Sequence, residues 1–368
     1  MRRPLAIGAV ALAVVSALLL SGCGPTDAQS APSPSTTDRR PLAELDLADD
    51  PQAWVGPSSA VLADERIEPI AASPEQHLPA TVVSHDHSGD RTVVVADTSR
   101  VIALDMAGSI AATVWGLGLG SSLVGRDMST TFTGADELPV VTSGAHAVNA
   151  EAVLALRPTL VITDGTIGPR DVLEQLRSAG VDVVFVENDS SFEGAAELAR
   201  QVGATLGVPE TGEALAVQIS DDVAAKIVEI AGIAPADPAD RVRVIFLYLR
   251  SGSGISYLFG SESGADVLID ALGAVDVATE VGWTGMKPVT DEALIAADPD
   301  LILVMTDGLA SVGGVDGLLE SKPALALTGA GEHRRIVDMA DGDILSFGPR
   351  SAAVLDALAR AIYAPVKG

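Results

Sequence analysis

The sequence predicts an α/β protein of two lobes, each built around a central, mostly parallel β-sheet, with one long α-helix joining them. Three observations carry this prediction. Short β-branched runs alternate with helix-length segments before residue 206 and again after residue 241. Between these regions, residues 210–230 contain no proline and keep a helical apolar period. A fourteen-residue pattern occurs once on each side of that segment.

Composition narrows the class of protein further. With 368 residues, 48% of them hydrophobic, the chain can form two domains with large cores, and wholesale disorder is excluded. A net charge of −27 argues against a nucleic-acid partner, because phosphate contacts require clustered Lys and Arg. The single cysteine excludes an intramolecular disulfide framework, a four-cysteine zinc site and an iron–sulfur cluster.

Residues 1–22 have the pattern of a signal peptide. Two arginines precede the apolar stretch Leu5–Leu20, which is shorter than the roughly 20 residues that a membrane-spanning helix needs. The string Leu20-Ser-Gly-Cys23 resembles a bacterial lipobox, in which cleavage precedes the cysteine and its thiol receives a lipid. The resemblance implies an extracytoplasmic protein anchored to the cell membrane through a lipid on Cys23. The alternatives are an ordinary secretory signal with an incidental cysteine, or a short anchor.

The mature chain divides into four predicted parts. Residues 23–80 comprise the lipidated cysteine, a flexible tether rich in Ser, Pro and Thr, and an extension whose packing is left open. The N-terminal lobe is residues 81–207, the connecting helix 208–238 and the C-terminal lobe 239–368. Pro209 at the start of the helix, and Gly232 and Pro235 beyond it, are typical helix boundaries.

The elements of each lobe follow from hydrophobic periodicity. In the N-terminal lobe, β-branched runs around the polar string His85–Asp90 predict a hairpin. Further elements are expected there as helices at 104–119, 149–156, 169–178 and 191–205, and strands at 159–163 and 182–186. In the C-terminal lobe they are strands at 242–248, 300–305 and 335–338, and helices at 264–272, 291–297 and 349–362.

An internal repeat supports two similar halves. Asn149–Ile162 aligns with Thr290–Leu303, and five of the fourteen positions are identical. Each copy predicts a capped helix, a proline and a buried strand. The alternative is chance similarity between two ordinary helix–strand units.

Two Rossmann-like lobes on one stiff helix, behind a lipid tether, resemble the helical-backbone (class III) substrate-binding proteins of ABC importers, which have a periplasmic-binding-protein-like fold. The resemblance covers about residues 81–368. It implies a monomer without enzymatic activity that delivers haem, a ferric siderophore, cobalamin or a metal ion to a permease and its ATPase.

Tyr248 and His146 are the candidate iron ligands. Ligands of open α/β sheets lie outside the carboxyl ends of the strands, and Tyr248 ends a predicted strand. Arg250, two residues on, would stabilise a phenolate, which is a hard donor suited to ferric iron. His146 lies in a glycine-containing loop before the first repeat helix, and imidazole is a common ligand of iron. The alternatives are a packed strand-end tyrosine and a solvated histidine.

Three local strings carry a second resemblance: Thr142–Glu151, Phe246–Arg250 and Phe347–Arg350. They resemble the corresponding strings of the HmuT-type haem-binding lipoproteins of actinobacteria. The resemblance implies haem b as the transported ligand, with Tyr248 and His146 as axial ligands from opposite lobes and Arg250 supporting the tyrosinate. Other haem-binding members of the superfamily use Tyr alone.

Other residues carry weaker predictions. Met305 ends a strand and is an alternative soft ligand, although packing explains it as well. Trp283 and Met286 could give a flat apolar wall for a porphyrin. Ser261 and Ser263 precede a helix, where they could bind a propionate or cap the helix.

Glu151 and Glu292 occupy matching first turns of the repeat, where a negative charge stabilises the helix. The superfamily resemblance also implies that they dock onto arginines of the permease.

Two further classes of function remain open. His85 and His87 have the spacing of metal ligands, and a third ligand near them would indicate a surface metal-dependent hydrolase; a solvated turn is the simpler explanation. The other class is a ligand-free adhesion or sensory module. The sequence contains no P-loop, G-x-S-x-G or H-E-x-x-H motif.

Overall fold

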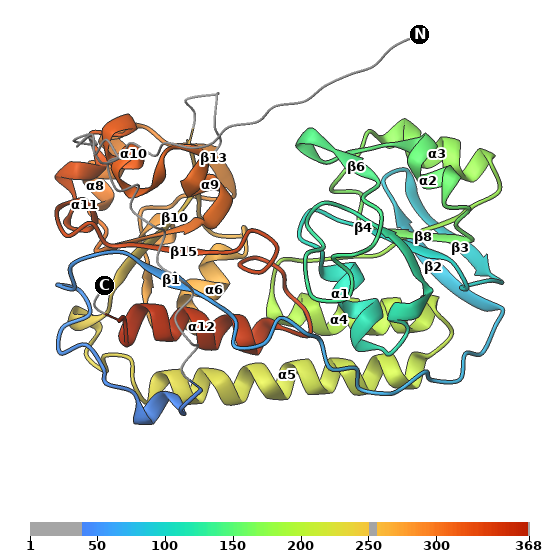
Figure 1. Ribbon diagram of the computed structural model, residues 1–368, viewed down its shortest axis with the longest axis horizontal. Coiled ribbons are helices and arrows are strands. Elements are labelled where there is room, and N and C mark those ends of the chain that lie inside the picture. Colours follow the sequence, from blue (N-terminus) through green and yellow to red (C-terminus); the bar gives the residue numbers. More distant parts are fainter. Residues whose placement is uncertain (1–38, 250–255, 367–368) are drawn as a thin grey trace, which may run out of the picture. The chain divides into compact units, whose positions relative to one another are not determined.

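The computed structural model describes residues 39–249 and 256–366 of the chain (Figure 1). The predicted signal peptide, Cys23 and Arg250 lie outside the described residues. Within those ranges, no helix combines the length and the hydrophobicity needed to cross a membrane.

The N-terminal lobe contains a four-stranded parallel sheet of order β5-β4-β8-β9. Its strands are β4 (Val101–Leu104), β5 (Leu123–Arg126), β8 (Leu160–Thr163) and β9 (Asp182–Phe185), and its helices are α1 (Ser109–Gly116), α2 (Ala150–Ala155), α3 (Arg170–Ser178) and α4 (Phe192–Thr205). Successive strand residues pack into separate core clusters on the two faces, Ile162 into one and Val161 into the other. The strands are therefore buried on both faces, as parallel strands usually are.

The C-terminal lobe contains a seven-stranded sheet of order β1-β15-β14-β10-β11-β13, with β12 beside β10. Five strands, β1, β15, β14, β10 and β12, are mutually parallel, whereas β11 pairs with β10, and β13 with β11, in antiparallel fashion. The strands are β1 (Ser58–Ala60), β10 (Arg243–Leu249), β11 (Ser256–Phe259), β12 (Val275–Asp276), β13 (Met286–Pro288), β14 (Leu301–Met305) and β15 (Ile336–Met339). The helices are α6 (Ala265–Ala271), α7 (Val277–Glu280), α8 (Asp291–Ala297), α9 (Thr306–Ser311), α10 (Gly314–Ser321), α11 (Gly329–Glu332) and α12 (Ser351–Tyr363).

Helix α5 (Pro209–Ala231) contributes to the cores of both lobes. Leu215 and Ile219 belong to the core cluster that contains the strands of the N-terminal lobe. One to three turns later, Val223 and Ile230 belong to a cluster with strands of the C-terminal lobe. Figure 1 shows α4 and α12 lying along α5. The predicted fold class, two mostly parallel sheets and one long helix, is confirmed.

The predicted repeat has a structural counterpart. Asn149 Oδ1 accepts the N–H of Ala152 at the start of α2 (3.0 Å), and Thr290 Oγ1 accepts the N–H of Ala293 at the start of α8 (3.3 Å). The equivalent residues Arg157 and Asp298, each before a proline, have positive φ values of 48° and 39°. The two copies therefore share their capping and the left-handed residue that ends the helix.

The helix predicted at 104–119 is shorter than expected. Residues 101–104 form strand β4, and α1 begins only at Ser109. The reason is the intervening turn, in which the carboxylate of Asp105 accepts backbone N–H groups of Ala107, Ser109 and Ile110. Gly108 has a φ of 75°, a conformation that favours glycine.

The extension before residue 80 packs on the C-terminal lobe. β1 pairs in parallel with β15, and Leu42 is buried in the core of that lobe. Arg335 is fully buried and donates to Ser58 Oγ (2.7 Å) and to the carbonyl oxygens of Ala361 (2.7 Å) and Ile362 (3.1 Å). Its positive charge thus lies at the C-terminal end of α12, where a cation is favourable, and connects the extension to that helix.

The predicted hairpin is confirmed as β2 (Ala80–Asp86) and β3 (Gly89–Val95), and it covers the outer edge of β9. The N–H of Phe185 donates to Ser84 Oγ (2.9 Å), and Arg91 donates to the carbonyl oxygen of Val183 (3.2 Å). These bonds satisfy backbone groups at an edge that would otherwise be open to a further strand.

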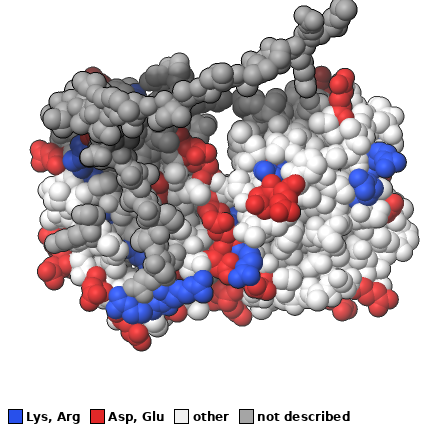
Figure 2. Space-filling view, in the orientation of Figure 1, with Lys and Arg blue, Asp and Glu red and all other residues white. Residues whose placement is uncertain are grey.

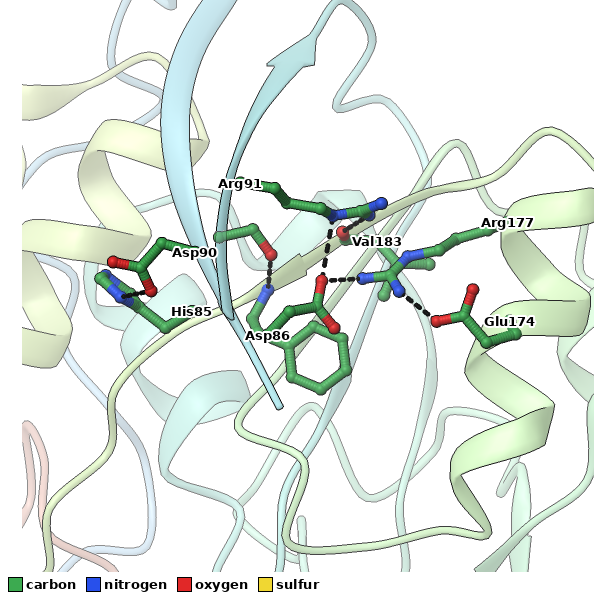
Figure 3. A network of polar contacts seen from close by, with 9 residues as sticks. His85, Asp86, Asp90, Arg91, Glu174, Arg177 and Val183 are labelled. Carbon is green, nitrogen blue, oxygen red and sulfur yellow. Dashed lines mark hydrogen bonds and ion pairs between the residues drawn. The ribbon is translucent and has the colours of Figure 1, made fainter. Parts of the chain in front are cut away.

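An ion-pair network fixes the hairpin in place (Figure 3). The carboxylate of Asp86 contacts Arg91 (2.9 Å) and Arg177 of α3 (2.5 Å), and Arg177 also pairs with Glu174. The side chains of Asp86 and Arg177 are only 7% and 13% exposed. Arg177 also lies over the ring of Phe185, 5.2 Å from its centroid.

Replacing Asp86 by Ala should lower the free energy of unfolding by about 3 kcal/mol, because two guanidinium groups lose their anion, one of them while buried. Urea denaturation measures this effect. The matched control is Asp90→Ala, which breaks the more exposed pair with His85 and should cost less than about 1 kcal/mol. Equal losses in the two variants would contradict the role assigned to Asp86.

Candidate functional site

Tyr248 and Met305 lie on one face of the C-terminal sheet, at the carboxyl ends of neighbouring parallel strands. Phe246 of β10 is opposite Leu303 of β14, and the strand period of two carries this pairing forward to Tyr248 and Met305. Tyr248 is only half-buried, whereas its neighbours Leu247 and Leu249 are buried in the core on the other face. The structure therefore places the two predicted residues together.

The same face carries aromatic residues that the sequence analysis did not single out. Tyr257 of β11 is directly opposite Tyr248, and their ring centroids are 6.3 Å apart. Phe259 is stacked on Tyr248 with an interplanar angle of 18° and a centroid distance of 6.1 Å. Met286 of β13 is opposite Phe259 and is 54% exposed. The period-two pattern of Ser256–Phe259 is the signal that would have placed Tyr257 and Phe259 on one face.

Three further predicted residues, Trp283, Ser261 and Ser263, contact other residues of the C-terminal lobe. Trp283 packs against the core cluster on the face opposite Tyr248. The hydroxyl of Ser261 donates to the carbonyl oxygen of Trp283 (3.2 Å), and that of Ser263 donates to the carbonyl oxygen of Gly260 (2.5 Å). Ser263 Oγ also accepts the N–H of Ala265, the first residue of α6 (3.3 Å). The N-cap residue of α6 is Gly264, so Ser263 contacts the start of the helix from the position before the cap.

His146 lies in the tight turn of a small hairpin in the N-terminal lobe. The strands are β6 (Thr142–Ser143) and β7 (Ala147–Val148), joined by a 3-10 turn at Gly144–His146. His146 is half-buried and has a φ of 56°, a left-handed conformation that is uncommon for residues other than glycine.

Hydrogen bonds anchor this hairpin on both strands. The N–H of Met128 donates to Thr142 Oγ1 (2.9 Å), and the N–H of Val148 donates to the carbonyl oxygen of Gly168 (2.6 Å). The hairpin is therefore tied to the loops that follow β5 and β8. Since ligands of α/β sheets gather at such strand ends, the position of His146 suits ligand contact.

A pair of fully buried carboxyl groups supports these strand ends. Asp105 follows β4 and Asp127 follows β5, and the N–H of Asp105 donates to Asp127 Oδ2 (3.1 Å). Asp127 Oδ1 also accepts the N–H groups of Ser129 and Thr130, both at 2.9 Å. Burial raises the pKa of Asp127 to about 6. Burial and the neighbouring carboxylate of Asp127 raise the pKa of Asp105 well above its ordinary range.

Glu151 and Glu292 are exposed in the first turns of α2 and α8. Their positions are equivalent in the two copies of the repeat. The structure thus presents one exposed glutamate at the same place in each lobe.

His85 and His87 occupy the β2–β3 hairpin. The described residues contain no group of three or more His, Cys, Asp or Glu side chains placed to hold a metal ion. His85 instead contacts Asp90 (3.1 Å), and His87 packs edge-on against Phe185 at a centroid distance of 5.6 Å.

Figure 2 shows basic side chains in small separate groups among acidic ones on the visible described surface. This agrees with the net negative charge of the sequence, which argues against a nucleic-acid partner.

Comparison with known proteins assigns the family. Residues 102–341 match the protein family described as "Periplasmic binding protein". The chain belongs to this family. It is a substrate-binding protein of ABC importers with the class III, helical-backbone fold, and proteins of this family are not enzymes.

Solved structures of haem-binding proteins resemble this chain. The haem-binding protein HmuT is 36% identical, with a TM-score of 0.79, over 85% of this chain and 99% of its own. The periplasmic haem-binding protein RhuT from Roseiflexus sp. RS-1 is also 36% identical, with a TM-score of 0.65, over 73% of this chain and 98% of its own. BhuT, solved with two haems, is 32% identical, with a TM-score of 0.62, over 72% and 97%.

Two curated relatives are less similar. A cobalamin-binding protein of Halobacterium salinarum is 29% identical over 239 residues, and the chain covers 62% of its length. The ABC transporter substrate-binding lipoprotein YvrC of Bacillus subtilis is 26% identical over 284 residues, which are 76% of this chain and 85% of that protein.

The buried carboxyl groups of Asp105 and Asp127 predict a specific pH dependence of the free energy of unfolding. Because the pKa of Asp127 is raised from 3.8 to about 6 in the folded state, its stabilising contribution is complete below pH 4 and is lost as the pH rises through 6. The difference corresponds to about 3 kcal/mol, roughly half of which falls between pH 5 and pH 8.

Asp127→Asn removes this titration and keeps an oxygen for Ser129 and Thr130. Between pH 5 and pH 8, its free energy of unfolding should therefore rise relative to the wild type, by about 1 kcal/mol. Urea denaturation at both pH values measures this quantity. A constant difference between the two proteins would show that Asp127 does not titrate in this range.

Proposed function

We propose that this protein is an extracytoplasmic, lipid-anchored receptor that captures haem and delivers it to an ABC permease. The observation that carries the proposal is Tyr248, a half-buried phenol at the carboxyl end of β10 on a face of aromatic and thioether side chains. Such a face offers one hard oxygen donor for ferric iron and apolar surface for a porphyrin.

The comparisons support haem as the ligand. HmuT, RhuT and BhuT are all named as haem-binding proteins. HmuT has also been solved as variants in which a His, a Tyr, and an Arg two residues beyond that Tyr, are each replaced by Ala. His146, Tyr248 and Arg250 are the same residue types with the same Tyr-x-Arg spacing. Cys23 and the lipoprotein relative YvrC support the lipid anchor.

In the proposed mechanism, the two lobes hold the porphyrin between them. Tyr248 and His146 bind the iron from opposite sides, and Arg250 stabilises the phenolate by charge and hydrogen bonding. Because α5 belongs to both cores, the lobes make only small movements. Release then requires the permease to pull on the lobes and lengthen the axial bonds, with Glu151 and Glu292 as its docking contacts.

Cobalamin is the second candidate, favoured by the cobalamin-binding relatives from Halobacterium salinarum. A titration with cyanocobalamin under the same conditions as haemin distinguishes the two. Binding of cyanocobalamin without binding of haemin would replace the haem proposal.

Haemin should bind the wild-type protein and give a Soret band that Tyr248→Phe abolishes or shifts. This variant keeps the ring stacked on Phe259 and removes only the oxygen donor, so we expect affinity to fall about 100-fold or more. His146→Ala should weaken haemin binding less than Tyr248→Phe, because other haem-binding members of the superfamily use Tyr alone.

The matched control is Tyr257→Phe, which removes a hydroxyl from the same face. It should leave the Soret band and the affinity within about twofold of the wild type. If Tyr257→Phe abolished the band and Tyr248→Phe did not, Tyr248 would not be the ligand.

The double variant Glu151→Lys, Glu292→Lys should bind haemin normally but fail to support haem uptake by cells, because reversed charges repel basic residues of the permease. The control is Glu193→Lys, an exposed glutamate in the first turn of α4 that has no counterpart in the repeat. Uptake of haem as the sole iron source measures the effect. Equal uptake in both variants would exclude the docking role.

A further inference from the structure

Two methionines occupy matching positions at the carboxyl edge of the N-terminal sheet. Met106 is the second residue after β4, and Met128 is the second residue after the neighbouring parallel strand β5. Each directly follows one of the two buried carboxyl groups, Asp105 and Asp127. Despite their apolar character, the two residues are 47% and 43% exposed.

Hydrogen bonds fix the backbone of both methionines. The N–H of Met106 donates to Thr166 Oγ1 (3.0 Å), and its carbonyl oxygen accepts the hydroxyl of Ser129 (2.7 Å). The N–H of Met128 donates to Thr142 Oγ1 (2.9 Å). The exposed thioethers thus project from fixed positions, and a ligand that covers them gains the free energy of apolar burial with little backbone ordering.

The same bonds connect the methionines to the hairpin of His146. Thr142, which accepts the N–H of Met128, is the first residue of β6, and His146 lies in the turn that follows β6. Ser129 in turn connects the loop of Met128 to Met106. One hydrogen-bonded region therefore presents two polarizable thioethers and one imidazole. Thioether sulfur makes favourable contacts with aromatic rings.

We infer that Met106 and Met128 contact the face of the porphyrin ring on which His146 binds the iron. The inference rests on the proposed haem-binding function and adds to it a contact with the ring instead of the iron. This contact is independent of the metal. It therefore applies equally to haemin and to metal-free protoporphyrin IX, whereas axial coordination by Tyr248 applies to haemin alone.

The test compares both porphyrins. Met106→Gln, Met128→Gln keeps the side-chain length and removes the thioethers, and it should weaken binding of haemin and of protoporphyrin IX by a similar factor, about tenfold. The Soret position of bound haemin should not change. Tyr248→Phe should weaken haemin binding far more than protoporphyrin IX binding. The matched control is Val228→Gln, a 73% exposed residue of α5, which should change neither affinity.

A second measurement uses the wild-type side chains. Oxidation by chloramine-T, followed by mass spectrometry, should convert Met106 and Met128 to sulfoxides more slowly in the haemin-loaded protein than in the free protein. A methionine introduced by Val228→Met should be oxidised at the same rate in both. If haemin binds, but the methionines are not protected and the double variant binds both porphyrins normally, the inference is wrong and the proposed function stands. If haemin does not bind the wild type, both fail.

Discussion

The structure depends on one constraint: a single helix, α5, belongs to two hydrophobic cores. Its first half packs with the N-terminal sheet through Leu215 and Ile219, and its second half packs with the C-terminal sheet through Val223 and Ile230. A break in this helix would expose apolar surface in both lobes at once. The arrangement therefore limits how far the lobes can move and holds each set of strand ends in a defined place.

The two lobes present their candidate ligands on different kinds of support. In the C-terminal lobe, Tyr248 is part of a strand and stacks on Phe259 of the next strand, so the phenol is positioned by the sheet itself. In the N-terminal lobe, His146 lies in a hairpin turn that hydrogen bonds tie to the loops after β5 and β8. The buried carboxyl groups of Asp105 and Asp127 organise the loops after β4 and β5 through backbone N–H bonds, at the cost of a pH-dependent loss of stability.

Much of this fold could be predicted from the sequence, because its strong signals are local. The periodicity of 209–230 gives α5 almost to the residue, and the repeat gives the capped helices α2 and α8. The short strand β1 could not be predicted, because its three residues gain their partner, β15, only through long-range packing. The strand β4 was hidden in an apolar segment interpreted as helix, since apolar periodicity does not report the local turn that the Asp105 carboxylate and Gly108 form between β4 and α1.

The candidate site was predictable to a similar extent. Tyr248 and Met305 are found by the rule that ligands gather at carboxyl strand ends, and the structure places them on one face. The period of two puts Tyr257 and Phe259 on one face of β11, but their position beside Tyr248 depends on the antiparallel register of β10 with β11, which no local pattern specifies. The crystal structure of the haemin-loaded protein tests the central claim most directly. We expect the iron to be bonded to Tyr248 Oη on one side of the porphyrin and to the His146 imidazole on the other. A porphyrin bound elsewhere, or an iron held by other residues, would contradict this account.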